Sequence, residues 1–520
     1  MARQSKIILC KNIKLDREMK NVLTYSESDM LTLVNSSGVK VTEASDYSFI
    51  GKGDRDAITV GVPYAICLGC NYMAFQNYNY SNKWYFAFID RVEYISDGAT
   101  RLHYTVDIFA TWFDYWSNKA CYIVREHTNN DSVGSNTIDE GLALGDSYVI
   151  RSHATDGNIT NKQSWVIGAT YDPLQSREEL GAVYQGLYSG VVYYSYSTQA
   201  GLNSNLKAII NSDRGMQAVQ CVFTAPTFLV NTTGDGQVPS SYSVATYDTS
   251  ISPITSIGSY NPKNKKLLTY PYVYMELSNG VGSSSILHQE LFTGTNSSGN
   301  YVLRVDGALC PGCSVRMSPV NYNGSTKNIE EGVSLGKYPI CNFAGDVYVN
   351  WVTQNGVNIF TDVVSSALNL GMGAGTGSGG SIASGIFGLI NAGDELRRAE
   401  LVPPTVRGNM NAGDVFFSDN QLTFHLYKKT IKEEIARTID DYFSMFGYKT
   451  NRLKVANQLG RSNWNYVQIG PNETIGYQKD NVLAVPPADL DNINKLYQRG
   501  ITLWHNHTTL GDYTQNNNIV

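Results

Sequence analysis

Residues 83–95 read Lys83-Trp84-Tyr85-Phe86-Ala87-Phe88-Ile89-Asp90-Arg91-Val92-Glu93-Tyr94-Ile95, a run of aromatic and aliphatic residues that ends in alternating polar and apolar positions. Such residues suit a pleated, half-buried surface, and the alternation has the two-residue period of a β-strand. Similar short segments fill the chain from residue 1 to about 130, and they resume between 217 and 350. The sequence therefore predicts a mainly β fold.

The composition excludes several classes of protein. The chain has 520 residues, of which 17% are charged, and its formal net charge is −6. Without clustered Lys and Arg it lacks the electrostatic footprint of a nucleic-acid-binding protein. Its first apolar segment, Ile7 to Cys10, is too short for a signal peptide, so we expect synthesis in the cytoplasm.

The C-terminal region carries the clearest helix signals. Thr430-Ile431-Lys432-Glu433 has the spacing of a capping box, and apolar residues at helical spacing follow it up to Gly447. A second helix is expected to begin after Pro486-Pro487 and to end at Gly500. Its buried stripe is expected to consist of Leu490, Ile493 and Leu496. Because strand-like segments lie between these helices, this region is expected to be α+β.

Two further helices are expected between residues 176 and 215, one on each side of a strand at Val191 to Tyr196. We divide the chain into a β-rich body at 1–355, a hydrophobic Gly-rich insertion at 356–404 and an α+β region at 405–520.

The eight cysteines do not form a dense disulfide framework, so we expect reduced thiols. Cys67 and Cys70, like Cys310 and Cys313, have the spacing of metal ligands, so a shared zinc site is one alternative. The two pairs lie far apart in the sequence, and the first lies in an apolar run that indicates a buried strand. Buried core thiols are therefore the preferred interpretation, and no metal site is expected.

The strongest catalytic patterns are absent from the sequence. Neither GxxxxGK[ST] nor HExxH occurs. Residues 375–380 match GxGxxG, but no clear strand precedes them, as a dinucleotide-binding unit requires. His505-Asn506-His507 imitates a nuclease tripeptide without the acidic metal ligands that such chemistry needs. We therefore expect no enzyme, no cofactor and no catalytic residue.

One segment departs from the rest of the chain. The 31 residues from Val363 to Gly393 contain no charged side chain, and their centre is rich in glycine, which disfavours a helix. Two apolar arms flank this centre, so the segment is expected to form a hairpin. Its ten large apolar residues, the predicted functional residues, are Val363, Val364, Leu368, Leu370, Met372, Ile382, Ile386, Phe387, Leu389 and Ile390. Composition alone leaves open whether they meet a membrane or pack inside an oligomer.

Several blocks of the sequence share their order and spacing with one known family. They are Asn264-Lys265-Lys266-Leu267-Leu268-Thr269-Tyr270-Pro271-Tyr272, then Tyr338-Pro339-Ile340-Cys341 with Trp351 and Gln354-Asn355, then Ile439-Asp440-Asp441-Tyr442-Phe443 with Phe446-Gly447-Tyr448-Lys449 and Trp464-Asn465-Tyr466-Val467, and finally Gly500-Ile501-Thr502-Leu503-Trp504-His505. In these blocks the chain resembles the distal tail knob family of phi-29-like short-tailed phages. The resemblance is broad and is most specific after residue 260.

The resemblance implies a hexameric, β-barrel-based tube at the distal end of a phage tail, in which a hydrophobic loop from each subunit plugs the DNA channel. On infection such loops are expected to leave the tube and to form a pore in the host membrane for genome ejection. Val363 to Gly393 lies where the family's loop lies. The loop looks shorter here than in the best-known member, which leaves open whether one copy or several copies span the membrane.

The partners that follow are other copies of the chain, other tail proteins, the host membrane during entry and phage DNA that passes without specific binding. An acidic chain suits such a conduit, because a wall that attracted phosphate would retain the DNA. Two alternatives stay open. A receptor-binding or glycan-binding tail protein would use the many tyrosines, and a cell-wall hydrolase would need a pair of carboxylates that no spacing singles out.

Overall fold

The structure, a computed structural model, describes residues 6–45, 48–50, 57–76, 81–160, 162–172, 177–178, 181–210, 218–230, 234–239, 245–336, 338, 419 and 421–520. The chain divides into two compact units, and each is discontinuous in sequence. Unit 1 comprises Met1–Gly145, Ser259–Leu268 and Glu433–Val520, and unit 2 comprises Asp146–Gly258 and Thr269–Lys432. The boundaries expected from the sequence, at 355/356 and 404/405, lie outside the described residues and stay predictions.

The first sheet of unit 1 is antiparallel, with the strand order β3-β1-β6-β7-β8-β5-β4. Its strands are β1 (Lys6–Cys10), β3 (Lys40–Ser45), β4 (Ser48–Ile50), β5 (Ala57–Val60), β6 (Tyr72–Gln76), β7 (Trp84–Ser96) and β8 (Ala99–Val106). The two edge strands follow each other in the chain, and the step from Ser45 to Ser48 spans at most about 11 Å. The sheet is therefore rolled, with its edges brought near each other.

Strand β1 shows how this sheet packs on both faces. Ile7 and Leu9 are fully buried in one hydrophobic cluster, whereas Ile8 and Cys10 belong to another. Successive side chains of a strand point to opposite faces of the sheet. Because both faces are buried here, β1 needs a continuous apolar run instead of alternating polar and apolar residues.

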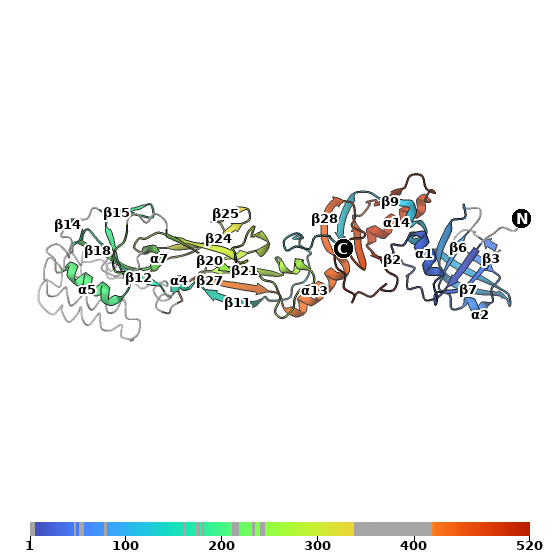
Figure 1. The fold of residues 1–520 in the computed structure, drawn as a ribbon, viewed down its shortest axis with the longest axis horizontal. Helices are drawn as coiled ribbons and strands as arrows, with labels where there is room; N and C mark the ends of the chain where they lie inside the picture. Colours follow the sequence, from blue (N-terminus) through green and yellow to red (C-terminus); the bar gives the residue numbers. More distant parts are fainter. Residues whose placement is uncertain are drawn as a thin grey trace. The chain divides into compact units, whose positions relative to one another are not determined.

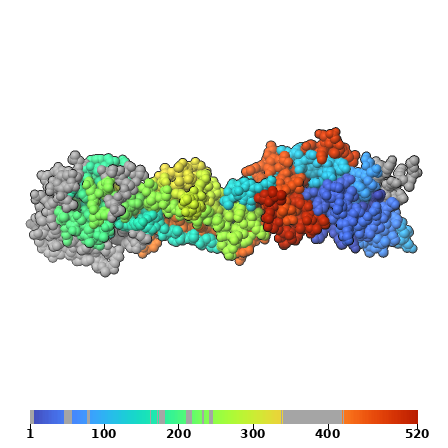
Figure 2. Space-filling view, viewed as in Figure 1, coloured from blue at the N-terminus to red at the C-terminus, as the bar shows by residue number. Residues whose placement is uncertain are grey.

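The second sheet of unit 1 joins the two ends of the chain. Its strand order is β2-β31-β29-β10-β28, and β31 is parallel to β2 and antiparallel to β29. The strands are β2 (Asn21–Leu23), β10 (Cys121–Glu126), β28 (Tyr448–Lys454), β29 (Trp464–Ile469) and β31 (Ile501–Trp504). Figure 2 shows the C-terminal residues, in red, packed against the N-terminal residues, in blue. Strand β31, near the C-terminus, therefore links the N-terminal strand β2 to the rest of this sheet in unit 1.

Helices and short strands complete unit 1. They are α1 (Glu27–Val34), α2 (Tyr64–Cys67), α3 (Ile108–Trp112), α13 (Glu433–Phe446) and α14 (Pro487–Arg499), the 3-10 turns η2 (Phe113–Tyr115) and η3 (Lys265–Leu268), and the paired strands β9 (Trp116–Asn118) and β30 (Gly476–Gln478).

The described residues of unit 2 form three larger sheets, in the orders β11-β27-β21-β22, β18-β12-β17-β19 and β20-β23-β24-β25, with β26 also paired to β24. The first is visible in Figure 1, where β11, β27 and β21 run side by side. The strands of these sheets are β11 (Val149–Thr155), β12 (Gln163–Ala169), β17 (Val192–Tyr196), β18 (Val219–Pro226), β19 (Gly236–Gln237), β20 (Ala245–Ile251), β21 (Val273–Ser278), β22 (Ser284–Leu287), β23 (Tyr301–Gly307), β24 (Val315–Tyr322), β25 (Ser325–Lys327), β26 (Val333–Leu335) and β27 (His425–Thr430).

Short elements complete unit 2. The paired strands are β13 (Tyr171–Asp172) with β14 (Arg177–Glu178) and β15 (Ala182–Tyr184) with β16 (Leu187–Ser189), and the helices are α4 (Gly157–Thr160), α5 (Gln199–Ile210), α7 (Thr227–Val230) and the 3-10 turn η4 (Gln289–Leu291).

The expected fold class is confirmed, because strands dominate and the C-terminal region adds helices α13 and α14. Strand β7 covers all but the first residue of 83–95, and β17 and α5 are the strand and one of the two helices expected between 176 and 215. Helix α14 has Pro487 in its first turn and ends at Gly500, as predicted. Its buried side chains are Ile493, Asn494 and Tyr497, while Leu490 and Leu496 are only partly buried.

The first helix expected between 176 and 190 is wrong. Strands β15 and β16 form a hairpin there, and its two turn residues, Gln185 and Gly186, have φ values of 45° and 83°. Positive φ at both central residues belongs to a tight hairpin turn and is incompatible with a helix. Cys67 is a second correction, because it ends the short helix α2 instead of lying in a buried strand.

The capping box at Thr430 is also wrong. Thr430 is the last residue of strand β27, and its hydroxyl accepts a hydrogen bond of 2.9 Å from Nε of Arg151. Helix α13 begins three residues later, at Glu433. The carboxylate of Glu433 instead accepts hydrogen bonds of 3.1 and 2.9 Å from the backbone N–H and the hydroxyl of Ser259. The predicted end of the helix at Gly447, with φ of 64°, is confirmed.

No helix within the described parts of the chain is long and apolar enough to cross a membrane. The seven cysteines in the described ranges are free thiols, which agrees with the expectation of reduced cysteines for those seven.

The closing strand β31 supplies the first test. Trp504 is fully buried, its ring centroid lies 5.0 Å from that of Trp464, and Nε1 donates a hydrogen bond of 2.9 Å to Oδ1 of Asn21. Trp504→Ala is expected to lower the free energy of unfolding of unit 1 by about 3 to 5 kcal/mol, because it leaves a cavity beside Trp464 and removes one of the hydrogen bonds to Asn21. Urea unfolding followed by tryptophan fluorescence measures this change.

Leu453→Ala is the matched control, because Leu453 lies in the same sheet but is 75% exposed. The control is expected to change the unfolding free energy by less than about 0.5 kcal/mol. Equal effects of the two substitutions would show that β31 does not close the core.

Candidate functional site

The ten predicted loop residues, Val363, Val364, Leu368, Leu370, Met372, Ile382, Ile386, Phe387, Leu389 and Ile390, all lie outside the described residues, and so does the GxGxxG match at 375–380. The His505-Asn506-His507 tripeptide is described. Nδ1 of His505 lies 2.9 Å from the Thr24 hydroxyl, and Nε2 lies 3.0 Å from Oδ1 of Asn465. Both ring nitrogens are therefore used in hydrogen bonds that hold unit 1 together.

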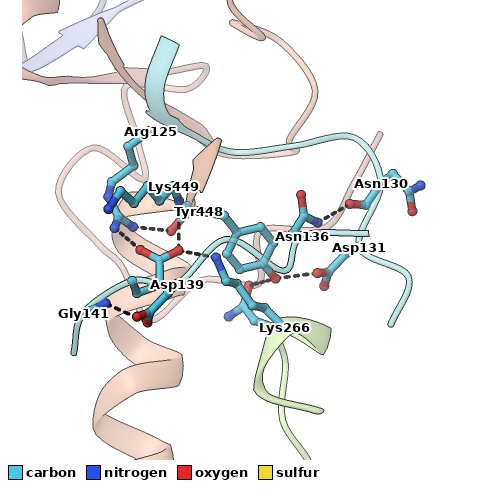
Figure 3. Close-up of polar contacts among 12 residues, drawn as sticks. Arg125, Asn130, Asp131, Asn136, Asp139, Gly141, Lys266, Tyr448 and Lys449 are labelled. Carbon is cyan, nitrogen blue, oxygen red and sulfur yellow. Dashed lines mark hydrogen bonds and ion pairs between the residues drawn. The ribbon is translucent and has the colours of Figure 1, made fainter. Parts of the chain in front are cut away.

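A buried carboxylate joins the three chain segments of unit 1. The side chain of Glu140 is fully buried, and it forms ion pairs with Arg125 and with Lys266, which are 10% and 2% exposed. The backbone N–H of Lys449 donates a third hydrogen bond to it, at 2.9 Å. Figure 3 shows Arg125, Lys266 and Lys449 gathered around the stretch from Asp139 to Gly141.

Asp131 makes a second connection among the same segments. Its carboxylate accepts hydrogen bonds from the Tyr448 hydroxyl and, at 3.1 Å, from the backbone N–H of Lys265. The Tyr448 side chain points to Asp131 in Figure 3, and its hydroxyl lies 3.3 Å from Oδ1 of Asn264. Strand β28 and turn η3 are therefore fixed to the loop that follows β10.

Asp440 on helix α13 holds the segment 259–268 from the other side. Its carboxylate accepts hydrogen bonds from the Tyr260 hydroxyl at 2.5 Å and from the backbone N–H groups of Lys263 and Asn264 at 2.7 and 3.0 Å. The side-chain amide of Asn264 adds a bond of 2.7 Å. A fully buried carboxylate with this many donors stays satisfied without water.

We call Asp131, Glu140 and Asp440, with the groups that bind them, the carboxylate network. Burial lowers the pKa of Lys266, and the ion pair with Glu140 partly offsets this effect. Burial raises the pKa of Asp131, and burial together with Asp131 raises that of Tyr448. Burial also lowers the pKa of nearby His127 to about 3, so this imidazole is neutral at physiological pH. The full burial of the Glu140 side chain and of Asp440 is typical of a structural network.

The sheet β11-β27-β21-β22 of unit 2 has a buried and an open face. Val273, Met275 and Leu277 of β21 are fully buried on one face. On the other face the register places Glu276 opposite Tyr427 and Tyr427 opposite His153. Six of the seven residues of edge strand β11 are exposed, and among the described strands β11 pairs with β27 alone. Within the described part of the chain, the outer edge of β11 therefore has no strand partner.

The described ranges contain no cluster of metal-binding side chains. No three His, Cys, Asp or Glu side chains gather there in a way that could hold a metal ion. The two Cys pairs fall in different units, because Cys67 and Cys70 belong to unit 1 and Cys310 and Cys313 to unit 2.

The model of the family described as the C-terminal domain of the tail knob protein gp9 of Bacillus phage phi29 matches residues 238–518, which is more than half of the chain. The chain belongs to this tail knob family. A second family model, the N-terminus of the caudoviral major tail protein, matches residues 3–117 and thus the rolled sheet of unit 1.

Relatives match along the whole length. The tail knob proteins gp9 of Bacillus phages B103 and PZA are each 25% identical, and that of phage phi29 is 24% identical. Each alignment covers 98% of this chain and 97% of the relative. The structure of the tail knob protein gp12 of bacteriophage C1 matches with a TM-score of 0.66 at 14% identity, over 99% of this chain and 100% of that one, which shows a shared fold.

This tail knob family member is a structural component of a phage tail, and such a component associates with other tail proteins. The carboxylate network suits that role, because it joins the three segments of the chain that make up unit 1. Sequence reasoning missed it, since Asp139-Glu140-Gly141 has the composition of an exposed turn. The partners of Glu140 come from distant positions, Arg125 and Lys266, and no local pattern indicates them.

Glu140→Gln tests the network. The amide keeps the shape but removes the charge, so Arg125 and Lys266 stay buried without an anion. We expect the free energy of unfolding of unit 1 to fall by about 3 to 5 kcal/mol, measured by urea unfolding.

Asp441→Asn is the control, because its ion pair with Lys263 is 68% and 64% exposed. It is expected to change the unfolding free energy by less than about 1 kcal/mol. A Glu140→Gln protein as stable as this control would show that the network is dispensable.

Proposed function

We propose that this tail knob protein forms the distal end of the tail, closes the DNA channel before infection and uses the segment Val363 to Gly393 to penetrate the host membrane for genome ejection. The observation that supports this proposal is the uncharged segment itself, 31 residues long in a chain with a charged fraction of 17%. It lies within the part of the sequence that matches the tail knob family model.

The physical argument concerns the ten large apolar side chains of that segment. Removing each from water stabilises by roughly 1.5 to 3 kcal/mol, so together they favour burial by on the order of 15 to 30 kcal/mol. Both a closed channel and a lipid bilayer offer such burial. A segment that exchanges one for the other therefore suits a plug that becomes a membrane-penetrating element.

The charge of the chain supports the passage of DNA. A net charge of −6 gives the phosphate backbone no general attraction to the protein, so DNA is expected to slide without being bound.

We further propose that copies of the chain assemble into a ring, a hexamer by the family resemblance, and that strand β11 is one of the joining edges. The open edge of β11 supports this proposal, because unpaired backbone groups on an exposed strand favour pairing with another chain. Ile150 on this strand is 54% exposed and Tyr148 just before it is 37% exposed, which adds apolar surface to the edge.

Dye leakage from liposomes tests the membrane proposal. The full chain is compared with a variant in which residues 357–403 are replaced by a Gly/Ser linker and with an Ile386→Asp/Phe387→Asp variant. Each Asp at the bilayer centre costs about 2.5 to 3.5 kcal/mol, so we expect both variants to leak at least about ten-fold more slowly.

Ile329→Asp is the control, because Ile329 is 53% exposed and lies in a described turn of unit 2, outside the segment. It is expected to leak like the unaltered chain. Equal leakage from all four proteins, or none from any, would contradict membrane penetration and leave a plug that only closes the channel.

Ile150→Lys tests the joining edge. A lysine on the exposed edge opposes strand pairing between copies, and we expect the dissociation constant of the assembly to rise at least about ten-fold by sedimentation velocity. Ile329→Lys has nearly the same exposure and is expected to leave assembly unchanged. If Ile150→Lys assembles as well as this control, β11 is not a joining edge.

A further inference from the structure

Two histidines meet at one end of the open sheet face in unit 2. Nε2 of His153, on β11, lies 2.9 Å from Nδ1 of His425, the first residue of β27. The two rings are 17° from parallel, with centroids 5.2 Å apart, and the ring of Tyr427 stacks on His153 at 4.5 Å. A hydrogen bond of this kind requires one imidazole to donate an N–H and the other to accept with a lone pair.

The charged groups on and next to these strands have partners of their own. None of them is therefore available to compensate a second positive charge on the histidine pair. On β27 and β21, Lys429 and Glu276 are paired with each other. Arg151 on β11 binds the Thr430 hydroxyl. Just past β11, the Asp156 carboxylate accepts hydrogen bonds from the Tyr247 hydroxyl at 2.6 Å and from the backbone N–H of Asn158 at 3.0 Å.

The other described neighbours of the pair that the register and the turn after β21 bring close are uncharged. Ser278 of β21 and Thr155 of β11 lie opposite His425 in the register. Gly280, in the turn after β21, approaches the His425 ring so closely that an added Cβ would lie 3.0 Å from Nε2. The ring therefore has little room to turn away from His153.

Burial lowers the pKa of His425 below its ordinary value of 6.5, and a positive charge on His153 lowers it further, while the Gln421 backbone opposes the shift. A histidine with a depressed pKa contributes its stability above about pH 6.5 and loses it as the pH falls. When both rings carry a proton, no acceptor remains between them and two like charges are in contact. The side-chain hydrogen bond between His153 on β11 and His425 on β27 is then replaced by repulsion between two positive charges.

We propose that His153 and His425 form an acid-sensitive clasp that holds the edge strand β11 on its sheet at neutral pH and releases it when both rings are protonated. The clasp acts within a single chain. Its consequence for assembly rests on the proposed role of β11 as a joining edge. If that role holds, assembly of the tail knob protein weakens in acid.

Hydrogen exchange of the peptide that covers β11 tests the clasp. The protection factors of its amides are expected to fall at least about ten-fold between about pH 7.5 and about pH 5. His153→Gln and His425→Gln are expected to remove most of this pH dependence. The readout must be local, because buried His127 in unit 1 also destabilises the chain in acid.

His288→Gln is the matched control. His288 also stacks on an aromatic ring in unit 2, that of Tyr270 at 4.1 Å, but the carboxylate of Glu290 lies 3.8 Å from its Nδ1. The control is expected to keep the pH dependence at β11. Protection at β11 that does not change with pH, or that changes equally in the three variants, overturns the proposal.

A titration of the unaltered chain by NMR covers the case in which a variant fails to fold. The His425 imidazole is expected to titrate below its ordinary pKa of 6.5, because burial and a positive charge on His153 both oppose its protonation. Titration of His425 at or above pH 6.5 overturns the clasp. Acid-dependent exchange at β11 without any change in sedimentation supports the clasp and counts against β11 as a joining edge.

Discussion

The buried carboxylate of Glu140 is the constraint on which unit 1 depends. A charge taken out of water must meet opposite charges and hydrogen-bond donors, and here they come from β10, from η3 and from the start of β28. Asp131 and Asp440 repeat this arrangement between the same segments. The three segments of unit 1 therefore cannot separate without leaving charges unpaired. For a part of a phage tail, such a frame provides rigidity without a disulfide or a metal among the described residues.

The charge-linked frame of unit 1 contrasts with an uncharged, Gly-rich stretch in the sequence of unit 2. Unit 2 is inserted into unit 1 in two pieces, and the uncharged stretch Val363 to Gly393 falls in the second of them. Strands β24 and β27, which precede and follow that stretch in the sequence, each pair within a sheet of unit 2. The membrane penetration proposed for this stretch would require parts of the chain before and after it that keep their structure. The paired strands on both sides meet that need.

Sequence reasoning succeeded where local patterns decide the structure. Strand β7 and helix α14 follow from a two-residue period and from Pro487 and Gly500. Sequence reasoning failed where partners that are distant in the sequence decide the local structure. Thr430 has the spacing of a helix cap, yet it ends strand β27 and its hydroxyl accepts a hydrogen bond from Arg151. Ser259, rather than Thr430, donates a hydrogen bond to the carboxylate of Glu433. The stretch 182–189 forms a hairpin because Gln185 and Gly186 take left-handed conformations that the sequence pattern did not indicate. Glu140 gave no signal for the same reason, since its partners are far away in the sequence.

Photo-crosslinking to lipid tests the central claim most directly. The full chain would be mixed with liposomes that contain a phospholipid with a photoreactive acyl chain, irradiated and digested, and the peptides that carry lipid identified by mass spectrometry. The account predicts lipid adducts concentrated between Val363 and Ile390, at the apolar residues of the uncharged segment. Adducts confined to other parts of the chain, or a segment that stays unlabelled while the liposomes leak, would contradict it.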